Sequence, residues 1–235
     1  RIHGIYDSRA HSMDITEDNF KRYCNVPLVR YGSLQEACTD PDIDAIMICT
    51  PNHTHFDILS VAMETGKPIF LEKPMATSIE DAKSIVDACE RYEAFVQLGL
   101  QYRYKSQYVE ALHELKQRKS LGSLKTISLS EHRPPFLDKV DQWNKFNQNT
   151  GGTLVEKCCH YFDLMNLMAD AAPIRVYASG GQAVNFADFI RDGAASDIDD
   201  HAFVIIDYAN GVRGNFTLNM FCLLYTSPSP RDSIR

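Results

Sequence analysis

The sequence lacks several patterns that would place it in a specialised class of protein. It has no apolar run near the roughly 20 residues that a membrane helix needs, so we expect no membrane insertion. Basic residues are fewer than acidic ones, 24 against 31, and they form no stripe, which argues against a nucleic-acid partner. With 44% hydrophobic and 23% charged residues, the composition is that of a globular enzyme.

Cysteine pairs with metal-binding spacing are also absent. The cysteines are scattered singly except for Cys158 and Cys159, so they predict neither a zinc site nor a disulfide framework. The short groups that contain His53, His55 and His160 hold too few ligands at zinc spacing. We therefore expect no metal. Reduced thiols of this kind predict a cytoplasmic protein.

Apolar runs alternate with amphipathic stretches through the first hundred residues. Residues 45–49 and 69–71 have the continuous apolar character of strands buried on both faces, and residues 78–92 carry apolar side chains at helical spacing. Repeated strand, helix, strand units predict a parallel sheet with a ligand crevice beyond the carboxyl ends of its strands. We expect this α/β domain to cover residues 1–103.

The pattern changes after Arg103. Residues 107–116 predict a helix, residues 124–130 and 174–178 predict strands, and residues 202–208 and 212–220 predict a hairpin. Asn210-Gly211 between the last two is a strong signal for a type I′ turn. We therefore expect a second, α+β domain with a mostly antiparallel sheet over residues 104–221.

Charged residues end one of the predicted parallel strands. Glu72 and Lys73 follow the run Ile69-Phe70-Leu71 and precede Pro74. They would stand at the edge of the sheet where α/β enzymes place their chemistry. Taken alone, Lys73 is better explained as a solvated lysine, because most lysines are exposed.

A second motif begins with Gly151-Gly152. It places Glu156, His160 and Asp163 at positions i, i+4 and i+7, so a continuous helix would carry all three on one face toward a cleft. Apolar residues of the same segment would form the opposite, buried face. Taken alone, His160 is better explained as a core histidine of an amphipathic helix.

Together and in this order, the Glu72-Lys73-Pro74 strand end and the Gly-Gly-x-x-x-acid-x-x-x-His-x-x-Asp segment resemble the Gfo/Idh/MocA family of NAD(P)-dependent oxidoreductases. The resemblance spans roughly residues 2–220, with the usual error at element boundaries. It implies that residues 1–103 form a Rossmann-type dinucleotide-binding domain and that residues 104–221 bind the substrate. It also implies homo-oligomers formed through the sheet of the second domain.

The resemblance implies roles for the polar residues of both motifs. Lys73 would hydrogen-bond the substrate hydroxyl and help to move its proton, and His160 would share that acid–base task, for which imidazole has a suitable pKa. Glu156 departs from the aspartate that is usual in the family, so its substrate contacts are open. Asp163 is equally well explained as a structural partner, and Arg103 as either a ligand contact or a structural pair.

Other residues are predicted to contact the cofactor. Asp7 ends the first strand and would bind the adenosine ribose of NAD, whereas the nearby Arg9 could accommodate the extra phosphate of NADP. We therefore expect NAD, with NADP possible. The segment Thr50-Pro51-Asn52 matches the family's turn beside the nicotinamide half of the cofactor, with an ordinary turn as the alternative. The predicted cofactor site also includes His55, Glu72 and Lys73.

These expectations combine into one function. We expect hydride transfer between NAD(P) and a secondary alcohol of a sugar, polyol or related compound. Two alternatives on the same scaffold are a redox-assisted glycosidase with tightly held NAD and a non-catalytic sugar or cofactor sensor.

The two ends of the chain carry further expectations. No Gly-x-Gly-x-x-Gly turn occurs, so we expect a fragment that lacks the N-terminal phosphate-binding loop and a C-terminal part of the second domain. Residues 222–235 resemble the translation of a sequencing-library adapter, and we expect them to be an artefact tail. The alternative is a disordered Ser/Pro tail.

Overall fold

The computed structural model describes residues 1–221. Its contacts divide into two units, one formed by residues 1–50 and 54–99 and the other by residues 51–53 together with the chain from Leu100 onward. The predicted domain boundary, Arg103, lies in the short helix η2 (Gln101–Tyr104) of the second unit. The predicted artefact tail, residues 222–235, lies outside the described residues. None of the helices within residues 1–221 has both the length and the apolar character to cross a membrane.

The first unit alternates short strands with helices. Its strands are β1 (Gly4–Ile5), β2 (Val29–Arg30), β3 (Ile46–Ile48), β4 (Ile69–Leu71) and β5 (Val96–Leu98), and its helices are α1 (Ala10–Lys21), α2 (Leu34–Thr39), α3 (His55–Met63) and α4 (Ile79–Cys89). Strands β1 and β2 form one parallel sheet, and β3, β4 and β5 form another. The expected α/β architecture with parallel strands is confirmed.

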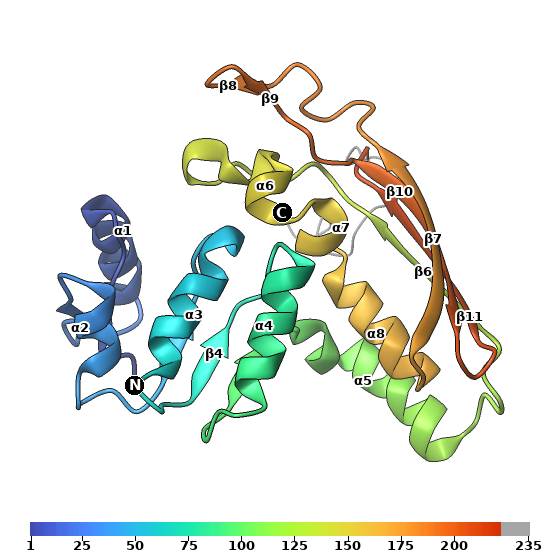
Figure 1. Cartoon of the computed structure of the whole chain (residues 1–235), viewed down its shortest axis with the longest axis horizontal. Helices are drawn as coiled ribbons and strands as arrows, with labels where there is room; N and C mark the ends of the chain where they lie inside the picture. The colour runs from blue at the N-terminus through green and yellow to red at the C-terminus, as the bar shows by residue number, and fades with distance from the viewer. Residues whose placement is uncertain (222–235) are drawn as a thin grey trace. The chain divides into compact units, whose positions relative to one another are not determined.

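Two helices of the first unit begin at serine caps. The Ser78 side chain accepts a hydrogen bond from the backbone N–H of Asp81, and Ser33 does the same for Glu36, which satisfies one otherwise unpaired donor at each helix start. Helices α3 and α4 lie beside β4 in Figure 1. Their apolar faces and the strands form one core, whose buried members include Ile48, Leu59, Ala62, Ile69, Leu71 and Ile85.

The second unit combines helices with a larger sheet. The helical segments that follow η2 are α5 (Ser106–Leu112), η3 (His113–Arg118), η4 (Val140–Lys145), α6 (Asn147–Thr150), α7 (Thr153–Glu156) and α8 (Cys159–Ala169), and η1 (Asn52–Thr54) begins in this unit. The strands are β6 (Thr126–His132), β7 (Pro173–Gly181), β8 (Ile190–Arg191), β9 (Ala194–Ala195), β10 (His201–Tyr208) and β11 (Arg213–Asn219).

The main sheet of the second unit has the strand order β6-β11-β10-β7. Strand β10 is antiparallel to both neighbours, whereas β11 and β6 are parallel, so the expectation of a mostly antiparallel sheet is confirmed. Helix α8 lies along one face (Figure 1). That face is buried, and a side chain at Gly214 would place its Cβ 2.5 Å from Met165 Cε of α8. Glycine there permits the close approach of helix and strand.

Two local predictions were wrong. The segment from Thr153 to Ala169 is not one helix, because α7 ends at Glu156 and α8 begins at Cys159. The hairpin between β10 and β11 exists, but its turn is not type I′: Gly211 has a positive φ of 87°, and Asn210 is not among the residues of positive φ. Instead, the Gly211 N–H donates to the Tyr208 carbonyl, and the Tyr208 N–H donates to Val212.

Candidate active site

In the first unit, the strand β4 delivers Glu72 and Lys73 to its carboxyl end. The Glu72 N–H continues the sheet by donating to the carbonyl of Ile48 at 2.9 Å, and the Glu72 carboxylate accepts the Lys73 N–H at 3.1 Å. Both side chains are partly buried, and the Lys73-Pro74 peptide bond is cis. The predicted catalytic lysine therefore stands two residues after the last residue of β4.

His55 connects this strand end to the turn after β3. Its side chain is 0% exposed. Nδ1 lies 2.8 Å from the carbonyl oxygen of Pro74, and Nε2 lies 3.1 Å from that of Thr50. Burial lowers the pKa of His55, although the two carbonyls favour the protonated ring. Both ring nitrogens thus face the backbone, so the geometry favours a structural role over the predicted cofactor contact.

Asp7 and Arg9 follow β1. The Asp7 carboxylate accepts the backbone N–H of Arg9 at 2.8 Å, immediately before α1. Asp7 is partly buried, and Arg9 is exposed. Asp7 after β1, Thr50 after β3 and Lys73 after β4 all follow the carboxyl ends of parallel strands, where such sheets bind their ligands.

The turn Pro51-Asn52-His53 groups with the second unit. Asn52 is buried, and its amide Nδ2 lies 3.5 Å from the carbonyl oxygen of Thr150, at the limit of a hydrogen bond. The His53 ring meets Trp143 edge to face, with ring centroids 6.4 Å apart. Thr50, by contrast, belongs to the first unit, where its hydroxyl accepts from that of Thr54 at 2.8 Å. Of the predicted nicotinamide turn, Thr50 therefore makes its contacts in the first unit, whereas Asn52 makes its contact in the second.

In the second unit, Glu156 and His160 do not share the open face of one helix that was predicted. Glu156 ends α7, whereas His160 lies in the first turn of α8. Both side chains are buried, with 6% and 2% of their surface exposed. The apolar side of this segment is buried as expected, with Cys158, Tyr161 and Met165 in the core of the second unit. The polar side is buried as well, so the expected separation into a buried face and an open face was wrong.

Asp163 and Arg103 bind each other. Arg103 donates from Nε to Oδ2 at 2.7 Å and from Nη2 to Oδ1 at 2.5 Å, a bidentate ion pair between η2 and α8. This hydrogen bond raises the pKa of Arg103. The pair favours the structural alternative for both residues over direct substrate binding.

Sequence reasoning missed the neighbours of His160. The ring of Tyr102 stacks on the imidazole, and Lys157 bonds to the Tyr102 hydroxyl at 2.7 Å. Both residues stand next in sequence to ones that the motifs singled out, Arg103 and Glu156. No periodicity pointed to them, because their contacts join segments far apart in the chain.

Among residues 1–221, one group of possible metal ligands lies close together: His3, Asp40 and Asp42. The Tyr31 hydroxyl and the Asp42 N–H already bind the carboxylate of Asp40. None of the histidines and cysteines that we considered as zinc ligands belongs to this group. It carries no further interpretation.

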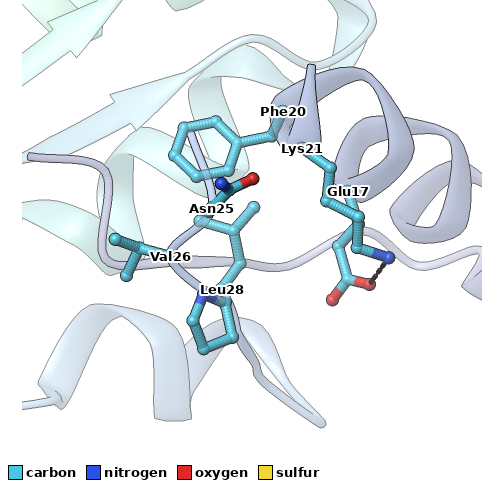
Figure 2. A pocket seen from close by; sticks show the side chains of 7 residues that line it. Glu17, Phe20, Lys21, Asn25, Val26 and Leu28 are labelled. Carbon is cyan, nitrogen blue, oxygen red and sulfur yellow. Dashed lines mark ion pairs between the residues drawn. The ribbon is translucent and has the colours of Figure 1, made fainter. Parts of the chain in front are cut away.

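A pocket of about 280 Å³ lies between α1 and the segment before β2, away from the motif residues. Figure 2 shows Phe20, Val26 and Leu28 on its wall, with Glu17 and Lys21 forming an ion pair at 3.9 Å. The lining is mainly apolar and contains no residue of either motif. We assign it no part in the chemistry.

Comparisons with known proteins agree with the two units. A family model described as "Oxidoreductase family, NAD-binding Rossmann fold" matches residues 1–100, and one described as "Oxidoreductase family, C-terminal alpha/beta domain" matches residues 114–234. Both models belong to the Gfo/Idh/MocA set. The second match extends into residues 222–235, outside the described part of the chain.

Individual proteins give the same result. The chain is 26% identical over 204 residues to the "Uncharacterized oxidoreductase YrbE" of Bacillus subtilis, covering 84% of this chain and 55% of that protein. It is 27% identical to the "scyllo-inositol 2-dehydrogenase (NAD(+))" of the same organism, covering 77% of this chain and 49% of that protein. The chain therefore spans about half the length of the curated relatives that it matches.

A solved structure shares the fold. The crystal structure of GenD2 from gentamicin A biosynthesis in complex with NAD aligns with a TM-score of 0.79 at 21% identity, covering 95% of this chain and 59% of that one. At this identity the likeness concerns the fold.

Proposed function

Because the chain belongs to the Gfo/Idh/MocA family of oxidoreductases, we propose that the protein transfers a hydride between NAD and a secondary alcohol of a sugar or polyol. The observation that carries the proposal is the partly buried Lys73 at the carboxyl end of β4, within the part of the chain that matches an NAD-binding fold. The inositol dehydrogenase among its relatives supports a cyclic polyol as the first substrate to test.

The side chains have distinct tasks in this proposal. Lys73 donates a hydrogen bond to the substrate hydroxyl, and His160 accepts the hydroxyl proton as the carbon becomes a ketone. NAD, when bound, accepts the hydride, so one hydride and one proton leave the alcohol. Asp7 holds the adenosine ribose and favours NAD over NADP. Glu156 lies four residues before His160 and is proposed to contact the substrate.

The geometry changes the roles of three predicted site residues. Arg103 and Asp163 act on the site through each other, as a clamp between η2 and α8. His55 supports the cofactor site by fixing the carbonyls of Thr50 and Pro74. We therefore assign substrate contact to none of these three.

The test is NADH formation by the full-length protein with a panel of inositols, aldoses and their glycosides. Lys73→Met should lower kcat by about 10²–10⁴-fold, the range for loss of an acid–base group. Lys83→Met is the matched control, because Lys83 is an exposed lysine on α4. A Lys73→Met enzyme as fast as the control would contradict the catalytic role. Release of a leaving group from glycosides without net NADH would identify the glycosidase, and tight sugar binding without turnover would identify the sensor.

We also propose that the protein forms homo-oligomers through the outer face of the main sheet. Tyr177, Phe203 and Ile205 expose 71%, 63% and 52% of their surface there, and Tyr177 is paired with Ile205 across β7 and β10. Exposed apolar groups of this kind mark interaction surfaces. Sedimentation should show an oligomer that Phe203→Asp dissociates. A monomeric wild-type protein would contradict the proposed homo-oligomer.

We also propose that the protein works in a reducing compartment. None of the cysteines among residues 1–221 forms a disulfide, and burial raises the pKa of Cys158 far above its usual range. A buried thiol of this kind is unreactive. This supports the predicted cytoplasmic location, which fractionation of cells that express the protein would test.

A further inference from the structure

The imidazole of His160 is covered on one face by the ring of Tyr102. The two ring centroids lie 4.2 Å apart, and the ring planes differ by 9°. Tyr102 comes from η2 and His160 from the first turn of α8, and both helices belong to the second unit. A face-to-face contact of this kind restricts rotation of the imidazole about its side-chain bonds. It leaves the edge of the ring, with its nitrogen atoms, outside the stack.

Tyr102 is itself held at several points. Tyr161, the residue after His160, meets the Tyr102 ring edge to face, with centroids 5.4 Å apart and an angle of 89°. Lys157 donates from Nζ to the Tyr102 hydroxyl at 2.7 Å. The ammonium of Lys105 lies 3.5 Å from the centroid of the Tyr102 ring, a cation–π contact. The plane of Tyr102 is therefore fixed from its edge, its hydroxyl and its face.

Lys157 lies between α7 and α8 and reaches both Tyr102 and Glu131. It occupies the first position after α7, and its side chain is only 15% exposed. Its ammonium lies 3.2 Å from the carboxylate of Glu131 on β6, and that carboxylate also accepts a hydrogen bond from the Tyr161 hydroxyl. A charge this deeply buried needs such partners. The contacts form a network that runs from His160 through Tyr102, Lys157 and Glu131 to Tyr161, and Tyr161 in turn contacts Tyr102.

The charged residues of this network change the pKa of the Tyr102 phenol. Burial alone would raise the pKa of Tyr102, but the hydrogen bond and charge of Lys157, with a contribution from Lys105, lower it below its ordinary value. Glu131 opposes them. The Tyr102 hydroxyl therefore accepts a charge-assisted hydrogen bond from the Lys157 ammonium, and this bond helps to hold the ring.

We propose that Tyr102 is a positioning residue for His160, and that Lys157 and Glu131 hold Tyr102 in the plane that orients the imidazole toward the substrate hydroxyl. The inference rests on the proposed function, in which His160 accepts the hydroxyl proton. Proton transfer depends steeply on the direction of the accepting nitrogen, and a misplacement of about 1 Å can cost about 10²-fold in rate. Stacking fixes the plane of the imidazole, and with it the directions in which its two nitrogens point.

The test separates the ring of Tyr102 from its hydroxyl. Tyr102→Met removes the ring but fills space, and Tyr102→Phe keeps the ring and loses the contact with Lys157. Tyr104→Met is the matched control, because Tyr104 lies in the same helix η2 and is 72% exposed. In the full-length protein, Tyr102→Met should lower kcat by about 10- to 100-fold with little change in KM. Tyr102→Phe should restore most of that loss.

A second measurement does not depend on turnover. The ring of Tyr102 shifts the imidazole proton signals of His160, which NMR assigns by their loss in His160→Gln. These signals should move in Tyr102→Met and stay near their wild-type positions in Tyr102→Phe. If Tyr102→Met does not fold, Lys157→Met replaces it, with a kcat loss of about 3- to 10-fold expected from a loosened ring.

The outcomes separate the two proposals. Equal kcat in Tyr102→Met and Tyr104→Met, or unchanged His160 signals in Tyr102→Met, would overturn the positioning role. If Lys157→Met takes its place, an unchanged kcat and unchanged His160 signals would overturn it equally. A wild-type protein without hydride transfer would overturn the proposed function and with it the role of Tyr102 in proton transfer, because the moved NMR signals would then show only that the ring covers His160.

Discussion

Two buried histidines, one in each unit, are fixed in different ways. His55 is 0% exposed and has a backbone carbonyl oxygen at each ring nitrogen. His160 is 2% exposed, and Tyr102 covers a face of its ring. The first arrangement engages both ring nitrogens with the backbone, whereas the stack on His160 engages the face of the ring. Burial by itself therefore does not distinguish the proposed structural histidine from the proposed catalytic one, and the mode of contact is the difference to test.

Replacing each histidine by alanine in the full-length protein should give the largest contrast. His160→Ala should lower kcat by about 10²–10⁴-fold, because it removes an acid–base group. The control is His113→Ala, since His113 is exposed at the start of η3. Steady-state kinetics at saturating NAD measure the effect. If His160→Ala and the control are equally active, the proposed catalytic role of His160 is contradicted.

The opposite variant should act on stability. His55→Ala removes the imidazole between the carbonyls of Thr50 and Pro74, one of which accepts the single N–H of the neutral ring. A buried group left unsatisfied costs about 1–3 kcal/mol. Urea unfolding should show this loss, and hydrogen exchange should rise first around Thr50 and Pro74. His113→Ala again serves as the control. Unchanged exchange at both turns would show that His55 does not hold them.

The pH dependence of stability should sharpen the comparison. The folded-state pKa of His55 lies below its ordinary value of 6.5, so the unfolded chain binds the proton more readily. The contribution of neutral His55 is therefore complete above pH 6.5 and declines as the pH falls through 6.5 toward the folded pKa. Urea midpoints between neutral and mildly acidic pH should show this decline. His55→Gln should flatten it, and an equal slope in that variant would rule His55 out as the cause.

The smallest effect is expected at the Arg103 and Asp163 clamp. Arg103 is 43% exposed, so solvent screens the pair, and Arg103→Lys should cost at most about 1 kcal/mol of stability. Loss of the bidentate geometry should still loosen η2, which carries Tyr102. Thermal unfolding in low and high salt measures the first effect. A cost far above this limit would mean that Arg103 does more than pair with Asp163.

Much of the fold could be predicted from local sequence. The runs at residues 45–49 and 69–71 became β3 and β4, as their continuous apolar character predicts. Burial on both faces was wrong for β3, because Met47 in its centre is 65% exposed. Strand β2 and helix α2 were not predicted, since each is short and has little periodicity. The hairpin of β10 and β11 was correct, whereas its turn type depended on the φ of one residue, Asn210.

The candidate site, like the fold, has parts that the sequence predicted and parts that it did not. The sequence by itself determined the family, the parallel and antiparallel sheets, and the position of Lys73 after a strand, because these follow from local patterns of apolar residues and from motif spacing. Only the tertiary structure decided that Arg103 binds Asp163, that His55 faces two carbonyls and that Tyr102 covers His160. Each of those contacts joins different elements of the chain, and the periodicity within one element carries no information about such pairs.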